Sequence, residues 1–224
     1  PKLRELVPQR YPIRHYPDIT HAIRAQYPVP EWDVAYALTL GREPINPRPH
    51  DMRAIFHLLQ SYTNGFITYS EGCNDDVNKF VWSSVGWKSD TPVIEILRQY
   101  SRYFIGPDVE EGFAQGLLAL EQNWRGPLLT NAGVYTTLEQ FQDMEAAASP
   151  DRMNNWRFQQ ALYRAYYDAF VRSRLINETA LEELALEALR DSQAGSLAAI
   201  DQAERRLELA DAYPPARDWR ARVI

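Results

Sequence analysis

Proline is the feature that most restricts how this chain can fold. Nine of its 15 prolines fall within the first 49 of its 224 residues. Each proline fixes φ and removes a backbone donor, so no long helix can run through this region. The sequence therefore predicts long irregular connections in its opening part, and connections of that kind in compact domains tend to carry function.

Short strands and helices are expected to alternate within this proline-rich part. Strands are predicted over 11–16 and over 65–70, the second being the β-branched and aromatic segment GFITYS. The spacing of apolar residues predicts a helix over 50–59 and another that begins near Asn74. The order strand, loop, helix, strand, loop, helix is typical of a parallel α/β layer.

Helical periodicity dominates the rest of the chain. Thr91 as a cap and Pro92 in the first turn predict a helix over 93–104. Asp108 and Glu111 have the spacing of a capping box for the next helix. Further helices are expected around 134–141, from 149 onward as the longest one, over 180–192 and over 197–212. We therefore expect an antiparallel helical domain over 91–224, preceded by a first unit over 1–90.

Composition excludes several classes of protein. A content of 45% hydrophobic and 24% charged residues excludes wholesale disorder. A net charge of −6 argues against nucleic acid or an anionic membrane surface as the main partner. No apolar stretch approaches the roughly 18 residues that cross a bilayer. Cys73 is the only cysteine, so there is no internal disulfide and no cysteine-rich metal site.

The two ends of the sequence indicate a segment of a longer protein or a processed one. The chain opens with Pro1, and residues 3–7 have the pattern of a helix already under way. It stops on the apolar pair Val223-Ile224 without a helix-ending signal. Two naturally ragged termini are the alternative interpretation.

The polar residues that follow the two predicted strands are the first candidates for chemistry. In parallel α/β architectures, ligands bind beyond the carboxyl ends of the strands. Glu71 comes directly after GFITYS, and Asp18 follows the first predicted strand. Two carboxylates at such a place suit general acid and base catalysis. The structural alternative for Glu71 is an acid that caps the next helix.

Polar and aromatic residues of the same loops suit a sugar substrate. Asp33, Asn74 and Asp75 could hold hydroxyl groups, and Trp32, Tyr27, Tyr69 and Trp87 could stack on sugar rings. There is no glycine-rich phosphate loop, no G-x-S-x-G motif and no catalytic cysteine signature. The alternatives are structural: acids at 75 and 76 favour the first turn of a helix, and tryptophans at 82 and 156 favour core packing.

Three residues spaced by three, His15, Asp18 and His21, suggest a metal site because histidine and aspartate are good ligands. Pro17 lies between them, so they cannot share one face of a helix. A histidine that is satisfied within the fold is the simpler interpretation. We therefore predict no metal and no cofactor, and keep a metal-dependent hydrolase as a third hypothesis.

Several motifs resemble the late part of (β/α)8-barrel glycoside hydrolases. Tyr27-Pro28-Val29, Asp33 and the stretch Leu40-Gly41-Arg42-Glu43 resemble the hyaluronidase-like β-N-acetylglucosaminidases. Residues 78–87, followed by TPVIEILRQYSRYFIG, are similar to the end of such barrels, including those of α-glucuronidases. The resemblance covers roughly residues 25–110. It departs from the pattern at Ala25-Gln26, where the β-N-acetylglucosaminidases have Asp-Asn.

This resemblance implies an α/β plus all-α protein in which the last few βα units of a partial (β/α)8 barrel precede an antiparallel helical domain. A complete barrel needs about 250 residues, so the segment would supply only part of an active site and would be inactive alone. It implies a glycoside hydrolase with Glu71 and Asp18 as catalytic carboxylates. The expected substrate contacts are Asp33, Trp32, Tyr69, Asn74, Asp75, Tyr27 and Arg42.

Two questions stay open at this stage. A non-catalytic helical module that binds a carbohydrate or a protein is the alternative to a hydrolase. The compartment and the oligomeric state are not fixed by the sequence, although a role in glycan degradation would suit an exported protein in the periplasm or outside the cell.

Overall fold

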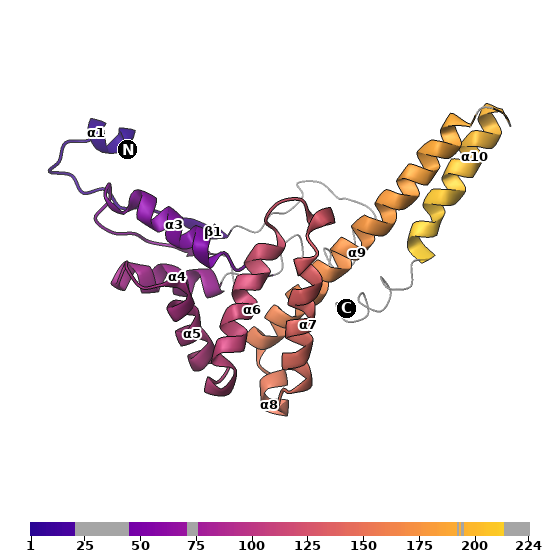
Figure 1. Cartoon of the computed structure of the whole chain (residues 1–224). Coiled ribbons are helices and arrows are strands. Elements are labelled where there is room, and N and C mark those ends of the chain that lie inside the picture. Colours follow the sequence, from indigo (N-terminus) through magenta and orange to yellow (C-terminus); the bar gives the residue numbers. More distant parts are fainter. Residues whose placement is uncertain (21–44, 71–75, 192, 194, 213–224) are drawn as a thin grey trace.

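The computed structural model describes residues 1–20, 45–70, 76–191, 193 and 195–212, without the side chains of residues 18, 20 and 211. This part of the chain is almost entirely helical (Figure 1). Its elements are α1 (Lys2–Leu6), β1 (Asp18–Thr20), α3 (Pro49–Gln60), β2 (Tyr69–Ser70), α4 (Asp76–Trp87), α5 (Val93–Phe104), η1 (Pro107–Val109), α6 (Glu110–Asn123), η2 (Leu128–Thr130), α7 (Gly133–Ala146), α8 (Pro150–Met153), α9 (Trp156–Arg190), α10 (Ser196–Leu207) and η3 (Glu208–Ala212).

The expected barrel is absent from the described residues. β1 and β2 form a parallel pair, with Asp18 opposite Tyr69, and no other strand of the described segments joins them. The prediction of a partial (β/α)8 barrel is therefore wrong, because this part of the chain is mainly helical. Strands of two and three residues bury too little surface to build a closed ring of the size that such a barrel requires.

Most of the two predicted strand segments is extended backbone rather than regular sheet. Before β1 and β2, the segments are joined by one parallel bridge, between His15 and Phe66, and by backbone hydrogen bonds from Asn64 to Ile13, from His15 to Gly65 and from Ile67 to His15. Pro17 cannot donate to the ladder, although its carbonyl accepts a hydrogen bond from the Tyr69 N–H at 3.1 Å. The pairing is also irregular between Asp18 and Thr20. These interruptions explain why a strand-like composition yields so little sheet.

The predicted helices are largely present, and the longest one is longer than expected. α3, α4 and α5 coincide with the helices predicted from apolar spacing. α9 joins into one helix of 35 residues what the sequence suggests are two separate helices. No glycine or proline lies between Trp156 and Arg190, so nothing in the backbone interrupts it. The predicted start at residue 149 belongs instead to the short α8, which the Ser149 hydroxyl caps.

Two of the predicted helix caps are wrong. α5 begins after Pro92, and Thr91 is not its cap. The Asp108 carboxylate forms two bonds to Arg152 Nη2, at 2.7 and 2.6 Å, instead of capping α6. Glu111 likewise accepts a hydrogen bond from Arg98 Nε at 2.6 Å. Arginines from neighbouring elements therefore compete successfully with the backbone donors that a capping box would satisfy.

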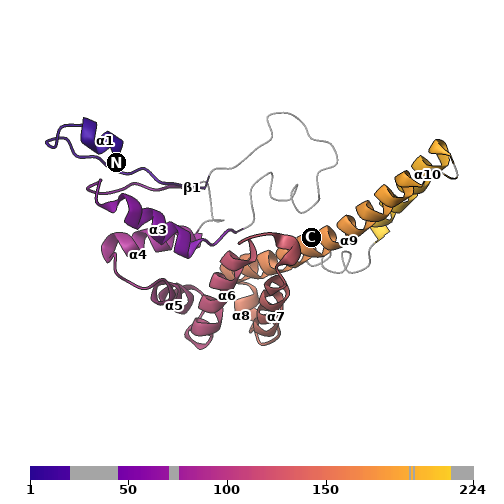
Figure 2. The ribbon, with the colours of Figure 1, turned by 45° about the horizontal axis from the view of Figure 1, so that its top comes forward.

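One hydrophobic cluster runs through most of the described chain, from Ile19 to Ala169. α5, α6, α7 and the first half of α9 pack side by side in sequence order, which fits the expected antiparallel arrangement. Figure 2 shows the strand pair beside α3 and α4, at the end of the molecule opposite α10. Among the described residues, no helix combines the length and the apolar character that would let it span a membrane.

A buried charged group stands at the centre of the helical body. The Asp168 carboxylate, fully buried, accepts hydrogen bonds from Arg164 Nε at 2.6 Å, Trp124 Nε1 at 2.7 Å and Asn123 Nδ2 at 2.8 Å. Burial raises the pKa of Asp168, and these three donors oppose that rise. Arg164 also donates to the carbonyl of Ile45, which ties the N-terminal part of the chain to α9.

We expect Asp168→Ala to destabilise the protein by about 3–5 kcal/mol, because Arg164 would stay buried without its anion. Glu178→Ala is the matched control, since it removes an i,i+4 partner of Arg174 in the same helix at an exposed position. The control should cost less than about 0.5 kcal/mol. Urea denaturation measures both, and similar losses for the two variants would contradict this account of the core.

Candidate functional site

The carboxyl ends of β1 and β2 lie next to each other because the two strands are parallel. Of the nine residues predicted as catalytic or as substrate contacts, the structure describes the backbone of Asp18 and the whole of Tyr69, which are direct neighbours across the pair. Trp87, the further candidate for stacking on a sugar, is 94% exposed at the end of α4. Tyr69 is half-buried, and its ring centroid lies 6.5 Å from that of Tyr16. The other predicted site residues lie outside the described residues: Glu71, Asp33, Trp32, Asn74, Asp75, Tyr27 and Arg42.

Asp76 and Asn78 also follow the second strand, and both have structural partners. The Asp76 carboxylate accepts hydrogen bonds from the Tyr100 hydroxyl at 2.8 Å and from Arg157 Nε at 2.7 Å. Burial raises the pKa of Tyr100, and the neighbouring Asp76 adds to that rise, so the hydroxyl remains a donor. Asn78 is buried and accepts a hydrogen bond from the Arg48 N–H at 2.8 Å. Both side chains hold α4 in place.

A second buried acid, Glu121, replaces a conventional cap at the start of α3. Its carboxylate accepts hydrogen bonds from the backbone N–H groups of His50 and Asp51, at 3.3 and 3.2 Å, and lies 2.8 Å from His50 Nδ1. Arg125 Nη2 contacts both Glu121 and Asp51. Burial opposes the ionisation of Asp51, but Arg125 and Arg48 together outweigh it and lower its pKa. These acids therefore anchor a helix and are already satisfied.

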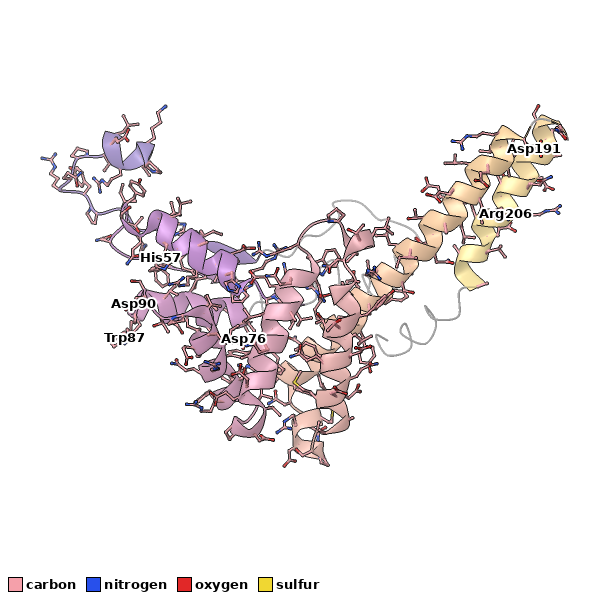
Figure 3. The ribbon with its side chains drawn as sticks, in the orientation of Figure 1. His57, Asp76, Trp87, Asp90, Asp191 and Arg206 are labelled. Atoms are coloured by element: carbon pink, nitrogen blue, oxygen red, sulfur yellow. The ribbon has the colours of Figure 1, made fainter. Side chains whose placement is uncertain are left out.

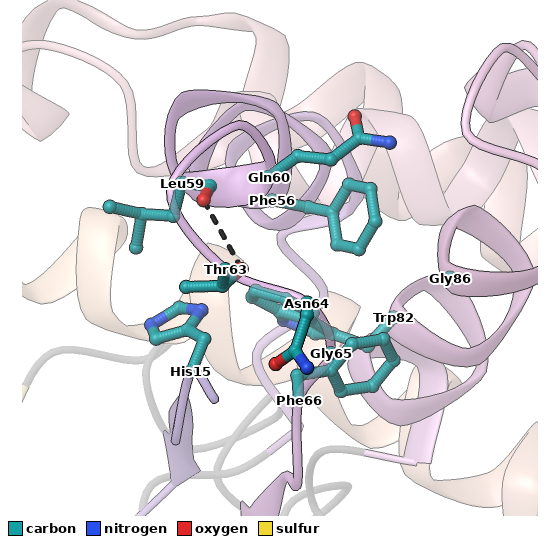
Figure 4. A pocket seen from close by; sticks show the side chains of 10 residues that line it. All are labelled: His15, Phe56, Leu59, Gln60, Thr63, Asn64, Gly65, Phe66, Trp82 and Gly86. Atoms are coloured by element: carbon teal, nitrogen blue, oxygen red, sulfur yellow. Dashed lines mark hydrogen bonds between the residues drawn. The ribbon is translucent and has the colours of Figure 1, made fainter. Parts of the chain in front are cut away.

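An aromatic cavity lies at the other end of the strand pair. Its volume is about 340 Å³, close to the lower limit for a small-molecule site. It is lined by His15, Phe56, Leu59, Gln60, Thr63, Asn64, Gly65, Phe66, Trp82 and Gly86 (Figure 4). These residues come from the approach to β1, the C-terminal half of α3, the turn before β2, and α4.

Three aromatic rings from different elements pack together at this cavity. The Trp82 centroid lies 5.5 Å from that of Phe56 and 5.4 Å from that of Phe66. The indole N–H of Trp82 points to Met52 Sδ at 3.2 Å, so it is already used. Trp82 and Phe56 are buried, at 1% and 8% exposure, so they belong to the core beneath the cavity. Phe66 is half-buried and is the ring of the three with accessible apolar surface.

Polar groups without partners surround these rings. Among the described residues, nothing forms a hydrogen bond with the half-buried imidazole of His15 or with the side-chain amides of Gln60 and Asn64, which are exposed to solvent. The Thr63 hydroxyl donates to the Leu59 carbonyl at 3.2 Å. Burial lowers the pKa of His15, so the imidazole is uncharged at neutral pH. No carboxylate lines the cavity, which can therefore bind a neutral polar ring but has no acid and base pair.

The hypothesis of a metal site gains no support from the described part of the chain. His15 lies against the Trp82 ring, with centroids 5.6 Å apart. His21 lies outside the described residues, as does the side chain of Asp18. Nowhere in the described segments do three potential metal ligands cluster.

Sequence reasoning missed this cavity. It assigned Phe56 to an apolar helical stripe, Phe66 to a strand and Trp82 to the core, each without reference to the others. The one local signal is Gly86, a glycine within a helix, where a Cβ atom would lie 2.5 Å from the Phe66 ring. The glycine allows Phe66 to lie against α4 and so leaves the cavity open.

Comparison of this chain with protein-family models, curated proteins and solved structures gives no match. The site is therefore interpreted from its geometry.

We expect Gly86→Ala to destabilise the protein by about 1–3 kcal/mol, because the new methyl group would overlap the Phe66 ring. Gly112→Ala is the matched control: it is also helical, and its Cβ would lie 3.7 Å from Met144 Sδ, an ordinary contact. The control should be neutral or should stabilise by up to about 1 kcal/mol through helix propensity. Thermal denaturation measures the change in stability of each variant. Equal stabilisation of both variants would contradict the prediction, because it would mean that the Phe66 ring moves aside without an energetic cost.

Proposed function

We propose that this chain binds a neutral saccharide ring in the aromatic cavity. The proposal is supported mainly by the half-buried Phe66 ring beside three polar side chains, His15, Gln60 and Asn64, that have no hydrogen-bond partner among the described residues. A sugar ring presents C–H groups on its face and hydroxyl groups around its edge. The Phe66 ring would cover the C–H face, and His15 with the exposed Gln60 and Asn64 would bind the hydroxyl groups in place of water.

The size and charge of the cavity support the same proposal. A volume of about 340 Å³ suits one ring rather than an extended polymer. The absence of a lining carboxylate and the lowered pKa of His15 leave it without a formal charge at neutral pH. This keeps the non-catalytic carbohydrate binding of the alternative hypothesis, but the cavity is lined by residues between His15 and Gly86 and not by the helical domain expected over 91–224.

The test is titration with methyl β-N-acetylglucosaminide and methyl β-glucoside, followed by ¹H–¹⁵N chemical shifts. We expect saturable shifts at the amides of Thr63, Asn64 and Gly65. Phe66→Ala should weaken binding about twofold to tenfold, since an aromatic contact contributes about 0.5–1.5 kcal/mol. Tyr103→Ala removes an aromatic ring that is 81% exposed and should have no effect.

Two outcomes would contradict this proposal. One is shifts that are confined to residues outside the cavity lining. The other is an equal loss of affinity in Phe66→Ala and Tyr103→Ala, which would mean that the cavity is not the binding site. Circular dichroism confirms beforehand that both variants are folded.

A second candidate function, glycoside hydrolysis, is favoured by one specific observation. The parallel pairing puts Asp18 opposite Tyr69, and Glu71 follows β2 directly in the sequence. Asp18 is the first residue of β1, whereas Glu71 comes after the last residue of β2. Two carboxylates carried by neighbouring parallel strands could serve as the acid and base of a glycosidase. The resemblance of residues 25–110 to glycoside hydrolases points to the same chemistry and does not depend on the cavity.

We expect Glu71→Gln to lower kcat at least 100-fold towards an aryl glycoside in a polypeptide that contains this sequence and is active, because a catalytic acid or base contributes 10²–10⁴-fold. Glu139→Gln on α7 is exposed and serves as the control with unchanged turnover. If Glu71→Gln retains full activity, Glu71 is not catalytic. That result would leave saccharide binding in the cavity untouched.

A further inference from the structure

The last part of the molecule is a helical hairpin that extends away from the body. We call it the arm: residues 174–190 of α9 together with α10. Up to Ser173, α9 is buried against the other helices, whereas beyond that point only Ala185 is buried. Figure 1 shows the arm projecting past α6 and α7, with α10 running back along α9. The arm therefore offers more surface per residue than the body does.

The two helices of the arm contact each other through alanines. Ala185 of α9 is buried, as are Ala199 and Ala203 of α10. Small residues allow the backbones to approach closely, and they leave the larger side chains outside. Eight large apolar side chains of the arm are more than a third exposed. Ile176, Leu184 and Leu197 point in other directions by helical geometry, and the remaining five are Leu175, Leu186, Leu189, Ile200 and Leu207.

Helical geometry puts these five side chains on one side of the arm. At about 100° per residue, Leu175, Leu186 and Leu189 fall within about 60° of one another on α9. On α10, Ile200 and Leu207 are about 20° apart. On each helix, the centre of the group lies about 70° from the mean direction of the buried alanines. The rotation has the same direction on both helices when each is viewed from its N-terminus. Because the two helices are antiparallel, this places both groups on the same side of the arm.

The charge around this apolar face is acidic. Between residues 174 and 212, Asp and Glu outnumber Arg nine to four. Arg174 and Arg205 are already paired with Glu178 and Asp201 within the arm. Glu182, Glu183 and Glu204, all exposed, fall by the same helical geometry within or beside the apolar stripes. Arg190 also falls beside the stripe of α9, so the acids there outnumber the base three to one. Figure 3 labels Asp191 at the outer tip of the arm and Arg206 further back along α10.

We propose that this face binds a basic amphipathic helix of a partner protein. Such a helix would lay its own apolar side against the five leucine and isoleucine side chains, as helices do in hydrophobic grooves. Its Lys and Arg residues would lie beside Glu182, Glu183 and Glu204. A second copy of this chain is disfavoured, because two arms of the same net charge would repel each other. The acidic charge equally disfavours an anionic membrane surface.

The test uses two synthetic helical peptides of 18 residues with the same leucine stripe, one flanked by lysines and the other by glutamates. Fluorescence anisotropy with the whole chain should show saturable binding of the lysine peptide, weakening as salt rises. The glutamate peptide should bind at least tenfold more weakly. Equal binding of both peptides would overturn the proposal, because charge would then play no part.

A pair of variants locates the binding face. Leu186→Gln combined with Leu189→Gln should reduce affinity for the lysine peptide at least tenfold. Leu184→Gln is the matched control: it is 40% exposed on the same helix, but about 160° away from Leu186. An equal loss in the control, or no loss in the double variant, would overturn the proposal.

Two other occupants of the face are outcomes of the same experiment. If sedimentation shows a dimer that Leu186→Gln and Leu189→Gln dissociate, the face is an interface between copies of this chain, and the proposal fails. If the peptide binds only after residues 213–224 are deleted, those residues occupy the face, and the proposal likewise fails.

Discussion

The attachment of residues 45–51 to the helical body is the constraint on which the rest of the structure depends. Arg164 on α9 donates to the carbonyl of Ile45, and Asn78 on α4 donates to the carbonyl of Asn46 at 2.9 Å. Glu121 on α6 accepts from the first backbone N–H groups of α3. Three helices thus hold one short segment through buried polar side chains. Because such groups are costly to bury unpaired, this attachment has little freedom to change.

This attachment also determines the shape of the aromatic cavity. The segment leads directly into α3, whose start is fixed by Glu121 and whose far end contributes Phe56 and Gln60 to the cavity. α4 supplies Trp82 and Gly86 and is held through Asn78 and Asp76. Both helical walls of the cavity therefore take their position from buried polar contacts with the body. A saccharide ring would meet a largely preformed site, which reduces the entropic cost of binding.

The sequence predicts the helices well and the sheet poorly, for a physical reason. Apolar spacing reports directly on which face of a helix is buried, so α3 and α5 match the predicted helices to within a residue, and α4 matches the helix predicted to begin near Asn74. The alternation of strand-like and helix-like segments does not indicate how many strands pair or how many residues each pair includes. The bridge at His15 and the short pair at Tyr69 are parallel, as expected, but their extent depends on proline and on irregular register. The resemblance to barrel enzymes reinforced a prediction that local pattern could not support.

The same distinction applies to the sites. The sequence predicts Asp76 as an acid in the first turn of a helix, but its partners Tyr100 and Arg157 are known only from the structure. The cavity depends on three rings that are 26 residues apart at most but belong to three elements, so no spacing rule reveals it. Conversely, seven of the nine residues predicted from the sequence lie outside the described residues, and their roles stay predictions.

The direction of the strand pair separates the two candidate functions in space. His15 and Phe66 stand at its amino end beside the cavity, whereas Thr20 and Ser70 stand at its carboxyl end, before Glu71. Five residues of extended chain between His15 and Thr20 span about 16 Å. A single sugar ring in the cavity is too small to reach across that distance. Hydrolysis at the carboxyl end would therefore act on a different ring of an oligosaccharide, or on a different molecule, from the one that the cavity holds. Saccharide binding in the cavity and hydrolysis at the carboxyl end of the strand pair are therefore independent proposals, and either function could exist without the other.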